Sequence, residues 1–194
     1  MHETGYAPGD DLRSRIAPTE RRYDAWLIGR VHDPRAAVLG GVAGHAGLFS
    51  SAGDLAIYAD ALLRRGESPS AERRLLKPTT FDVWLKPREV RLAPLKRVDD
   101  AKPPAVRTAL RTYGWDNASP YSSNRGKSLS PAAFGHGGFT GTSLWIDPDQ
   151  DLFVIFLSNR LHPDGKGSVN PLAGELADIA VAALRDRKPA TVSE

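Results

Sequence analysis

The chain has 194 residues, enough for one domain with its own hydrophobic core. Its 41% hydrophobic and 25% charged content is ordinary for a globular protein. Because 26 basic residues stand against 23 acidic ones, the net charge of +3 is too small to indicate a nucleic-acid partner. The absence of cysteine excludes disulfides, thiolate metal sites and a cysteine nucleophile. No apolar run reaches membrane-spanning length, and residues 1–15 lack a signal-peptide pattern, which leaves cytoplasmic and periplasmic locations open.

The first part of the chain reads as irregular. Residues 1–39 are polar, with little periodicity, and are interrupted by prolines. Residues 40–47 then hold four glycines beside His45. We interpret the glycines as a tight entry into the next helix, and His45 as a structural residue bonded to the backbone rather than a catalytic one.

A helix is predicted to follow this glycine-rich stretch. Ser51 precedes Asp54 in a cap-like Ser-x-x-Asp spacing, and an apolar face continues to about residue 65. Gly66 can end the helix, because glycine adopts the left-handed conformation at low cost.

Residues 67–131 are rich in proline, and we expect loops around short helices, one of them near residues 79–85. Basic residues gather in the middle of this stretch, with few aromatic residues among them, so a solvated loop is favoured over a site for an anionic polymer. The basic residues are Lys86, Arg88, Arg91, Lys96, Arg97, Lys102, Arg107 and Arg111.

A hairpin is predicted near the end of the chain. Residues 142–147 alternate in polarity, as a half-buried strand does, and residues 152–157 are apolar throughout, which indicates a central strand. Asp147 and Pro148 begin the turn between them. Just before the first strand, glycines flank His136, and this density favours a functional site over a plain hairpin.

The last predicted element is a helix that begins with Asn170 as its cap and Pro171 in its first turn. Its apolar face should pack on the sheet, and residues 187–194 should be frayed. The residues of this face are Leu172, Leu176, Ile179, Ala180, Ala183 and Leu184.

Two stretches resemble the serine β-lactamase, penicillin-binding protein and esterase superfamily, in its class C-like branch. Residues 134–160, FGHGGFTGTSLWIDPDQDLFVIFLSNR, are similar to the third active-site strand, which begins Lys-Thr-Gly, His-Thr-Gly or His-Gly-Gly in that superfamily. Residues 46–55, AGLFSSAGDL, are similar to the Gly-Leu-x-Ser-Thr-x-x-Asp-Leu segment. The resemblance extends over nearly the whole chain but covers only the downstream half of the family.

The resemblance implies an α+β fold, an antiparallel β-sheet flanked by helices, as a partial β-lactamase or DD-peptidase-like fold. We expect one partial domain over residues 1–194, with residues 40–131 mostly a helix and loop lobe and residues 132–186 the sheet hairpin plus the C-terminal helix. The family's sheet also uses strands from near its N-terminus, so we expect an unpaired sheet edge and an exposed apolar patch. A homodimer or a missing N-terminal half would cover them.

The resemblance also implies candidate site residues. His136 would be the cationic or proton-handling residue, and the backbone N–H of Phe139 would be one oxyanion donor. Gly137, Gly138 and Thr140 would bind substrate, the two glycines by leaving room for it along the strand. The implied reaction is acyl transfer from an amide or ester to water through a serine acyl-enzyme, with a β-lactam, a peptidoglycan fragment or a simple ester as substrate.

The other catalytic motifs of the superfamily do not occur in this sequence. No serine has a lysine three residues later, and the nearest pattern to Tyr-x-Asn, at residues 121–124, has one residue too many and is interpreted as loop. An oxyanion donor assists a nucleophile and cannot replace it. We therefore expect a C-terminal portion of a serine hydrolase that is inactive as this isolated chain. The alternatives are a non-catalytic module that binds peptidoglycan or a partner, and a fragment completed by another chain.

The sequence predicts no cofactor and no metal site. Its histidines, at positions 2, 32, 45, 136 and 162, show neither His-x-His nor His-Glu-x-x-His spacing. The expected partners are small-molecule or peptide substrates, without nucleic acid and without a membrane span.

Overall fold

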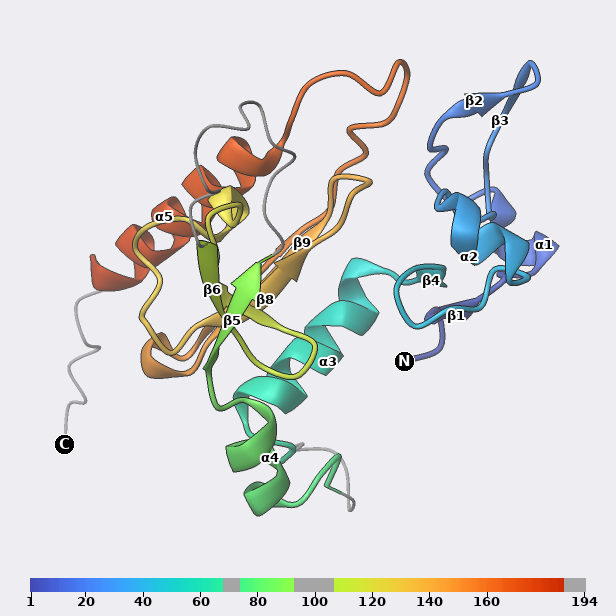
Figure 1. Cartoon of the computed structure of the whole chain (residues 1–194). Helices are drawn as coiled ribbons and strands as arrows, with labels where there is room; N and C mark the ends of the chain where they lie inside the picture. Colours follow the sequence, from blue (N-terminus) through green and yellow to red (C-terminus); the bar gives the residue numbers. More distant parts are fainter. Residues whose placement is uncertain (68–73, 93–106, 187–194) are drawn as a thin grey trace, which may run out of the picture.

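The computed structural model describes residues 1–67, 74–92 and 107–186 and has the α+β fold that the sequence predicted (Figure 1). An antiparallel sheet of six strands forms its centre, in the order β10-β9-β8-β7-β6-β5. In chain order its strands are β5 (Arg88–Leu92), β6 (Arg107–Arg111), β7 (Asp116–Ala118), β8 (Phe134–Gly137), β9 (Ser143–Asp147) and β10 (Leu152–Phe156). The short 3-10 helices η1 (Ser123–Arg125) and η2 (Pro148–Gln150) lie in the connections.

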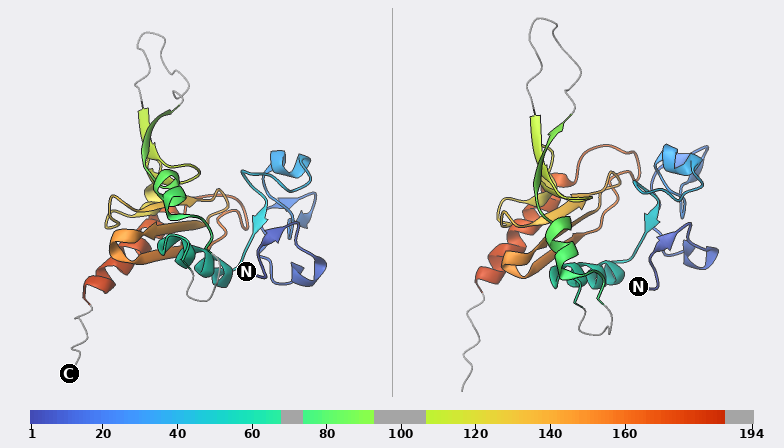
Figure 2. Two further views of the ribbon diagram at one scale, coloured as in Figure 1. Left: turned by 90° about the horizontal axis from the view of Figure 1, so that it is seen from below. Right: turned by 60° about the horizontal axis from the view of Figure 1, so that its bottom comes forward.

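Helices cover both faces of this sheet (Figures 1 and 2). On one face, α3 (Ala52–Leu63) and α4 (Pro78–Trp84) bury Leu62 and Phe81 in a cluster that includes Ile146 of β9. On the other face, α5 (Asn170–Arg185) buries Val181 in a second cluster that includes Trp145. Because neighbouring residues of a strand point to opposite faces, β9 contributes to both clusters.

The predicted hairpin is confirmed, but the burial of its two strands is the reverse of the prediction. Strands β9 and β10 pair with Leu152 opposite Asp147, and all five residues of β9 are buried rather than half-buried. All five residues of β10 are partly exposed, since β10 is an edge strand rather than a central one. No other strand of the described residues pairs with its outer side, which is the sheet edge that the sequence led us to expect.

Helix α5 packs on the sheet through a different face from the predicted one. Its buried residues are small: Ala173, Gly174, Ala177 and Val181. Leu172, Leu176 and Ile179 are 50%, 40% and 62% exposed and form an apolar stripe on the outer side. A side chain at Gly174 would collide with the backbone at Ser123 and Gly126, so only the small-residue face can approach η1. The cap also differs, because Val169 is the N-cap and no side chain caps the helix.

The other two helices begin and end close to where the sequence predicted. Ser51 accepts a hydrogen bond from the Asp54 N–H at the start of α3, and Gly66, with φ +85°, follows its end. Helix α4 occupies the stretch predicted near residues 79–85.

The prediction of loops around short helices for residues 67–131 is wrong for β5, β6 and β7. Strands β5 and β6 pair from Arg88 opposite Arg111 to Leu92 opposite Arg107. Residues 40–131 are therefore not only helix and loop. Part of the basic stretch lies on this strand pair rather than in a solvated loop, and Lys96, Arg97 and Lys102 lie outside the described residues.

Residues 1–50 form a separate group of short elements, here called the N-terminal region. It contains β1 (Gly5–Tyr6) paired with β4 (Leu48–Phe49), β2 (Arg21–Arg22) paired with β3 (Ala25–Trp26), and helices α1 (Asp10–Arg13) and α2 (Pro34–Val38). His45 bonds the Asp33 side chain (3.0 Å), not the backbone as we expected.

The N-terminal region contacts the rest of the chain at a few places. The Glu3 N–H and Thr4 hydroxyl donate to the Asp54 carboxylate (2.8 and 2.7 Å). The Trp26 ring lies 4.2 Å from that of His162, and the Asn159 side chain donates to the Pro18 carbonyl. These last contacts bring the region against the loop that follows β10.

Candidate functional site

The candidate site lies where β8 ends. Strand β8 pairs with β9 so that His136 is opposite Leu144 and Phe134 is opposite Ile146. Phe134 is buried in the core and fixes the strand, whereas His136 is exposed at its end. The sheet therefore holds the His136 backbone rigidly and leaves its ring accessible.

The glycines of β8 have a packing reason on the opposite face of the strand. A Cβ atom at Gly135 would collide with the Leu144 carbonyl and the Trp145 indole. A Cβ atom at Gly137 would collide with the side-chain amide of Asn124. The backbone of β8 thus lies directly on buried side chains, which explains the glycines next to His136 without reference to substrate.

The hydrogen bonds of His136 define its tautomer. Its Nδ1 lies 2.7 Å from the Gly137 carbonyl oxygen, which can only accept, so Nδ1 carries the proton. Its Nε2 lies 2.9 Å from Nη2 of Arg111, which can only donate, so Nε2 is the acceptor. His136 is therefore neutral in this arrangement, and the positive charge at the end of β8 belongs to the Arg111 guanidinium.

Arg111 and Tyr121 are candidate site residues that the sequence did not identify. Arg111 ends β6, and its Nη1 donates to the Tyr121 hydroxyl over 2.9 Å. The guanidinium carbon also lies 5.8 Å from the centre of the Tyr121 ring. Arg111, Tyr121 and His136 form one exposed polar group, here called the Arg111 triad. No sequence pattern links them, because 25 residues separate Arg111 from His136.

Phe139 lies in the turn between β8 and β9. The Gly141 N–H donates to the Gly138 carbonyl (3.0 Å) and closes this turn. Among the described residues we find no acceptor for the Phe139 N–H, so it is available as a donor. The Phe139 ring is 69% exposed and stacks on His32, 5.6 Å away, and the Arg160 side chain donates to the Phe139 carbonyl (2.7 Å).

Thr140 takes part in the same turn through its backbone. Its carbonyl accepts from the Arg160 N–H (3.0 Å), which ties the turn to the loop after β10. The residues predicted for the site, at positions 136–140, thus follow one another on a strand end and its turn, with Arg111 and Arg160 supplying positive charge beside them.

A buried carboxylate anchors the loop that leads into β8. Asp147 accepts from the Ser130 N–H (2.6 Å), the Ser130 hydroxyl (2.7 Å) and the Gln150 amide (2.7 Å). Burial opposes ionisation of this carboxyl, but the bonds from Ser130 and Gln150 outweigh it and hold the pKa of Asp147 below its ordinary value. An ionised, fully bonded Asp147 keeps the entry to β8 in place.

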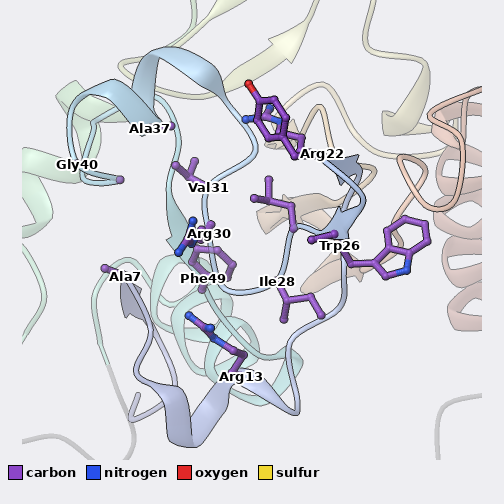
Figure 3. A pocket seen from close by; sticks show the side chains of 14 residues that line it. Ala7, Arg13, Arg22, Trp26, Ile28, Arg30, Val31, Ala37, Gly40 and Phe49 are labelled. Atoms are coloured by element: carbon purple, nitrogen blue, oxygen red, sulfur yellow. The ribbon is translucent and has the colours of Figure 1, made fainter.

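A cavity of about 850 Å³ lies apart from β8, within the N-terminal region (Figure 3). Its lining includes Arg13, Arg22 and Arg30 together with apolar side chains such as Ile28 and Phe49.

In the part of the chain that the structure describes, no group of three or more His, Asp or Glu side chains could hold a metal ion. None of the described helices is both long and apolar enough to cross a membrane.

The fold and the site together define a class of protein. An antiparallel sheet between helices, with a glycine-flanked histidine at a strand end, is the arrangement of the serine β-lactamase and penicillin-binding protein superfamily. The Beta-lactamase family profile matches residues 1–178, and the chain belongs to this family.

Individual relatives are similar in sequence to much of the chain. A protein named putative D-alanyl-D-alanine carboxypeptidase, from Escherichia coli K12, is 32% identical over 158 residues, which are 80% of this chain and 32% of that protein. An N-acetylmuramyl-L-alanine amidase of Bacillus subtilis is 32% identical over 139 residues, 70% of this chain and 27% of that protein. The chain thus spans about a third of the length of these relatives.

A solved structure supports the same assignment. The crystal structure of a beta-lactamase from Mycobacterium bovis matches with a TM-score of 0.50 and 25% identity. The match covers 72% of this chain and 46% of that protein. The predicted superfamily is therefore confirmed.

Proposed function

We propose that this chain forms the sheet side of the substrate cleft of a serine hydrolase that cleaves amide or ester bonds in carboxylate-bearing peptides. The observation that carries the proposal is the contact of Arg111 with both His136 and Tyr121. A guanidinium held beside a neutral histidine presents a fixed positive charge at the strand end, and arginine pairs well with carboxylates. The names of the two relatives above favour a peptide among the family's substrates.

Each site residue has a role in this proposal. Arg111 binds the substrate carboxylate, and Tyr121 holds the guanidinium in place. The neutral His136 accepts at Nε2 and can take a proton when substrate displaces Arg111 from it. The Phe139 N–H donates to the substrate carbonyl oxygen as negative charge develops there, while Gly137, Gly138 and Thr140 lie along the substrate.

The serine nucleophile is not supplied by a recognised motif of this chain. The sequence contains neither Ser-x-x-Lys nor Tyr-x-Asn. We therefore expect no acyl-enzyme from the isolated chain. Mass spectrometry after exposure to a fluorophosphonate or a penicillin should find no adduct. A stoichiometric adduct on one serine would contradict this part of the proposal.

Binding tests the Arg111 triad directly. An N-acetylated dipeptide with a free carboxylate should bind about tenfold more tightly than its carboxamide, the effect of one charge-assisted pair. Calorimetry gives the ratio, and NMR of the His136 ring reports whether the ligand reaches the triad. The R111Q variant should lose the preference, while R91Q, which changes an exposed arginine of β5, should keep it. An unchanged preference in R111Q would refute the assignment.

A second candidate function is a binding module completed by another polypeptide. It is favoured by two features of the described residues, the open edge of β10 and the exposed stripe of Leu172, Leu176 and Ile179 on α5. An added strand would satisfy the unpaired N–H and carbonyl groups of β10, and apolar side chains of the partner would cover the stripe. Light scattering after size exclusion should then give a dimer for this chain alone. A monomer at high concentration would exclude a second copy as the partner.

A further inference from the structure

The cavity in the N-terminal region differs from the Arg111 triad in both shape and charge. Its volume of about 850 Å³ is within the usual range for sites that enclose a small ligand. Fourteen residues line it, and its only charged residues are the three arginines Arg13, Arg22 and Arg30, with no acidic residue among the fourteen. The remaining lining is apolar, aromatic or glycine, including Leu27, Ile28, Val31, Trp26 and Phe49.

The positive charge of the cavity is only partly neutralised. The side chain of Arg22 pairs with Glu20 and donates to the His32 carbonyl. Arg13 approaches Asp10 at 3.4 Å, but that carboxylate is almost fully exposed and therefore a weak partner. Arg30 has no ion-pair partner among residues 1–67, 74–92 and 107–186. An anion can thus bind to Arg13 and Arg30 without displacing a strong internal partner.

Apolar side chains line the cavity together with these two arginines. Figure 3 shows the labelled side chains of Phe49 and Ile28 in the same lining as those of Arg13 and Arg30. A ligand that fits must carry an anionic group next to an apolar group. Inorganic ions have no apolar group, and purely apolar molecules would leave the guanidinium groups unpaired.

Contacts join the wall of the cavity to the turn that carries Phe139. Trp26 lines the cavity and packs against His162 in the loop after β10, with 4.2 Å between the ring centres. Arg22 also lines it and donates to the carbonyl of His32, whose ring stacks on Phe139. The wall of the cavity is therefore in contact with residues that lie beside the turn after β8.

We infer that this cavity binds an acidic side chain of the peptide substrate together with the apolar group next to it. The choice of a peptide rests on the proposed function, whereas the requirement for an anion with an apolar neighbour comes from the cavity itself. The substrate class is thereby narrowed to acidic peptides. Arg13 and Arg30 bind the carboxylate, and Phe49 and Ile28 contact the apolar group.

The test compares two tetrapeptides that differ only in one internal residue, glutamate or glutamine, and that share the same free terminal carboxylate. Calorimetry with the intact chain should show the glutamate peptide binding about tenfold more tightly, the effect of one arginine–carboxylate pair. The R13Q/R30Q double variant should reduce this ratio to about one and leave the affinity for the glutamine peptide unchanged. R35Q is the matched control, because Arg35 is exposed on α2 and does not line the cavity.

Further variants and ligands keep the result decisive. R13K/R30K retains the charge and should retain the preference, which separates loss of charge from loss of folding. An equal affinity of the intact chain for the two peptides, or an unchanged ratio in R13Q/R30Q, would overturn the inference. So would displacement of the glutamate peptide by inorganic phosphate at equal concentration, because the ligand class would then be a simple anion. The dipeptide acid and amide, which have no acidic side chain, test the Arg111 triad separately.

Discussion

The N-terminal region and the six-stranded sheet with its helices are stabilised by different contacts. In the sheet and its helices, large side chains such as Trp145, Phe134 and Phe81 are fully buried. In residues 1–50, all of which the structure describes, Ala36 is the one buried residue. That region is held instead by exposed ion pairs, such as Arg15 with Glu3, and by bonds to Asp54. Salt and pH weaken such contacts far more than they weaken apolar burial.

This difference has a consequence for the two proposed binding sites. His136 extends from a strand whose neighbours are buried, so its position is fixed. Arg13 and Arg30 lie in a region with few buried contacts, where local rearrangement costs little free energy. Substitutions in the sheet should therefore change the free energy of unfolding, whereas those around the cavity should change mainly ligand affinity.

The largest expected effect is on the buried carboxylate of the sheet. Asp147→Ala should lower the free energy of unfolding by about 3 kcal/mol, because the donors of Ser130 and Gln150 lose their acceptor in a buried place. Urea unfolding followed by Trp fluorescence measures the change. Asp149→Ala is the control, since that side chain is exposed, and should change stability by no more than about 0.5 kcal/mol. Equal effects of the two variants would refute the anchoring role of Asp147.

A smaller loss of stability is expected when a methyl group is added to β8. Gly135→Ala should destabilise the chain by about 2 kcal/mol, because the added Cβ meets the Leu144 carbonyl and the Trp145 ring. The control is Gly53→Ala in the first turn of α3, where a Cβ meets nothing within 4 Å. That variant should be neutral or up to about 1 kcal/mol more stable. If both glycines tolerate alanine equally, the sheet is less rigid at β8 than its packing indicates.

The sequence predicted the elements whose signals are local. Ser51 and Gly66 mark the ends of α3, and Asp147 marks the hairpin turn, because each acts on its own backbone within a few residues. The strands β5 to β7 were missed, since their sequences carry charged residues and gain order only by pairing across the sheet. Strand propensity depends on such context.

The difference between local signals and contacts made only in the folded chain also applies to the site and to α5. His136 could be found because its glycines are neighbours in the sequence, although those glycines are required by Trp145 and Asn124. Arg111 and Tyr121 could not, because their contacts arise from the sheet order. Likewise, periodicity reveals that α5 is amphipathic, but its fit against η1 determines which face is buried.

Substitutions on the two faces of α5 test which face is buried against the sheet. Ala177→Leu should lower the free energy of unfolding by about 1–2 kcal/mol, because a larger side chain cannot fit between α5 and the sheet. Leu176→Gln, on the exposed stripe, should change it by no more than about 0.5 kcal/mol. Thermal unfolding by circular dichroism gives both values. A large loss in Leu176→Gln at a concentration where the chain is dimeric would indicate that the stripe is covered by the partner.

The smallest effect concerns pH and the attachment of the N-terminal region. The hydroxyl of Thr4, followed by the N–H groups of Glu3 and His2, holds the pKa of Asp54 below its ordinary value. The pKa of Asp54 is lower in the folded chain than in the unfolded chain, where it is about 3.9. The stabilisation from Asp54 is therefore complete above about pH 3.9 and is lost as pH falls through the folded pKa. The pKa values of Glu3 and Asp33 are lowered as well, so all three carboxyls act in the same direction.

Acidification below about pH 4 should therefore release residues 2–4, whereas the buried apolar clusters keep the sheet folded even though the Asp147 anchor also weakens in acid. NMR follows the amides of His2, Glu3 and Thr4 for the attachment and the Trp145 indole for the core. Asp54→Asn should loosen the attachment already at neutral pH and remove most of its acid transition, since the amide cannot ionise. If the Trp145 signal changed at the same pH as the amides, the two regions would unfold together, and the N-terminal region would not have the separate stability that its polar contacts imply.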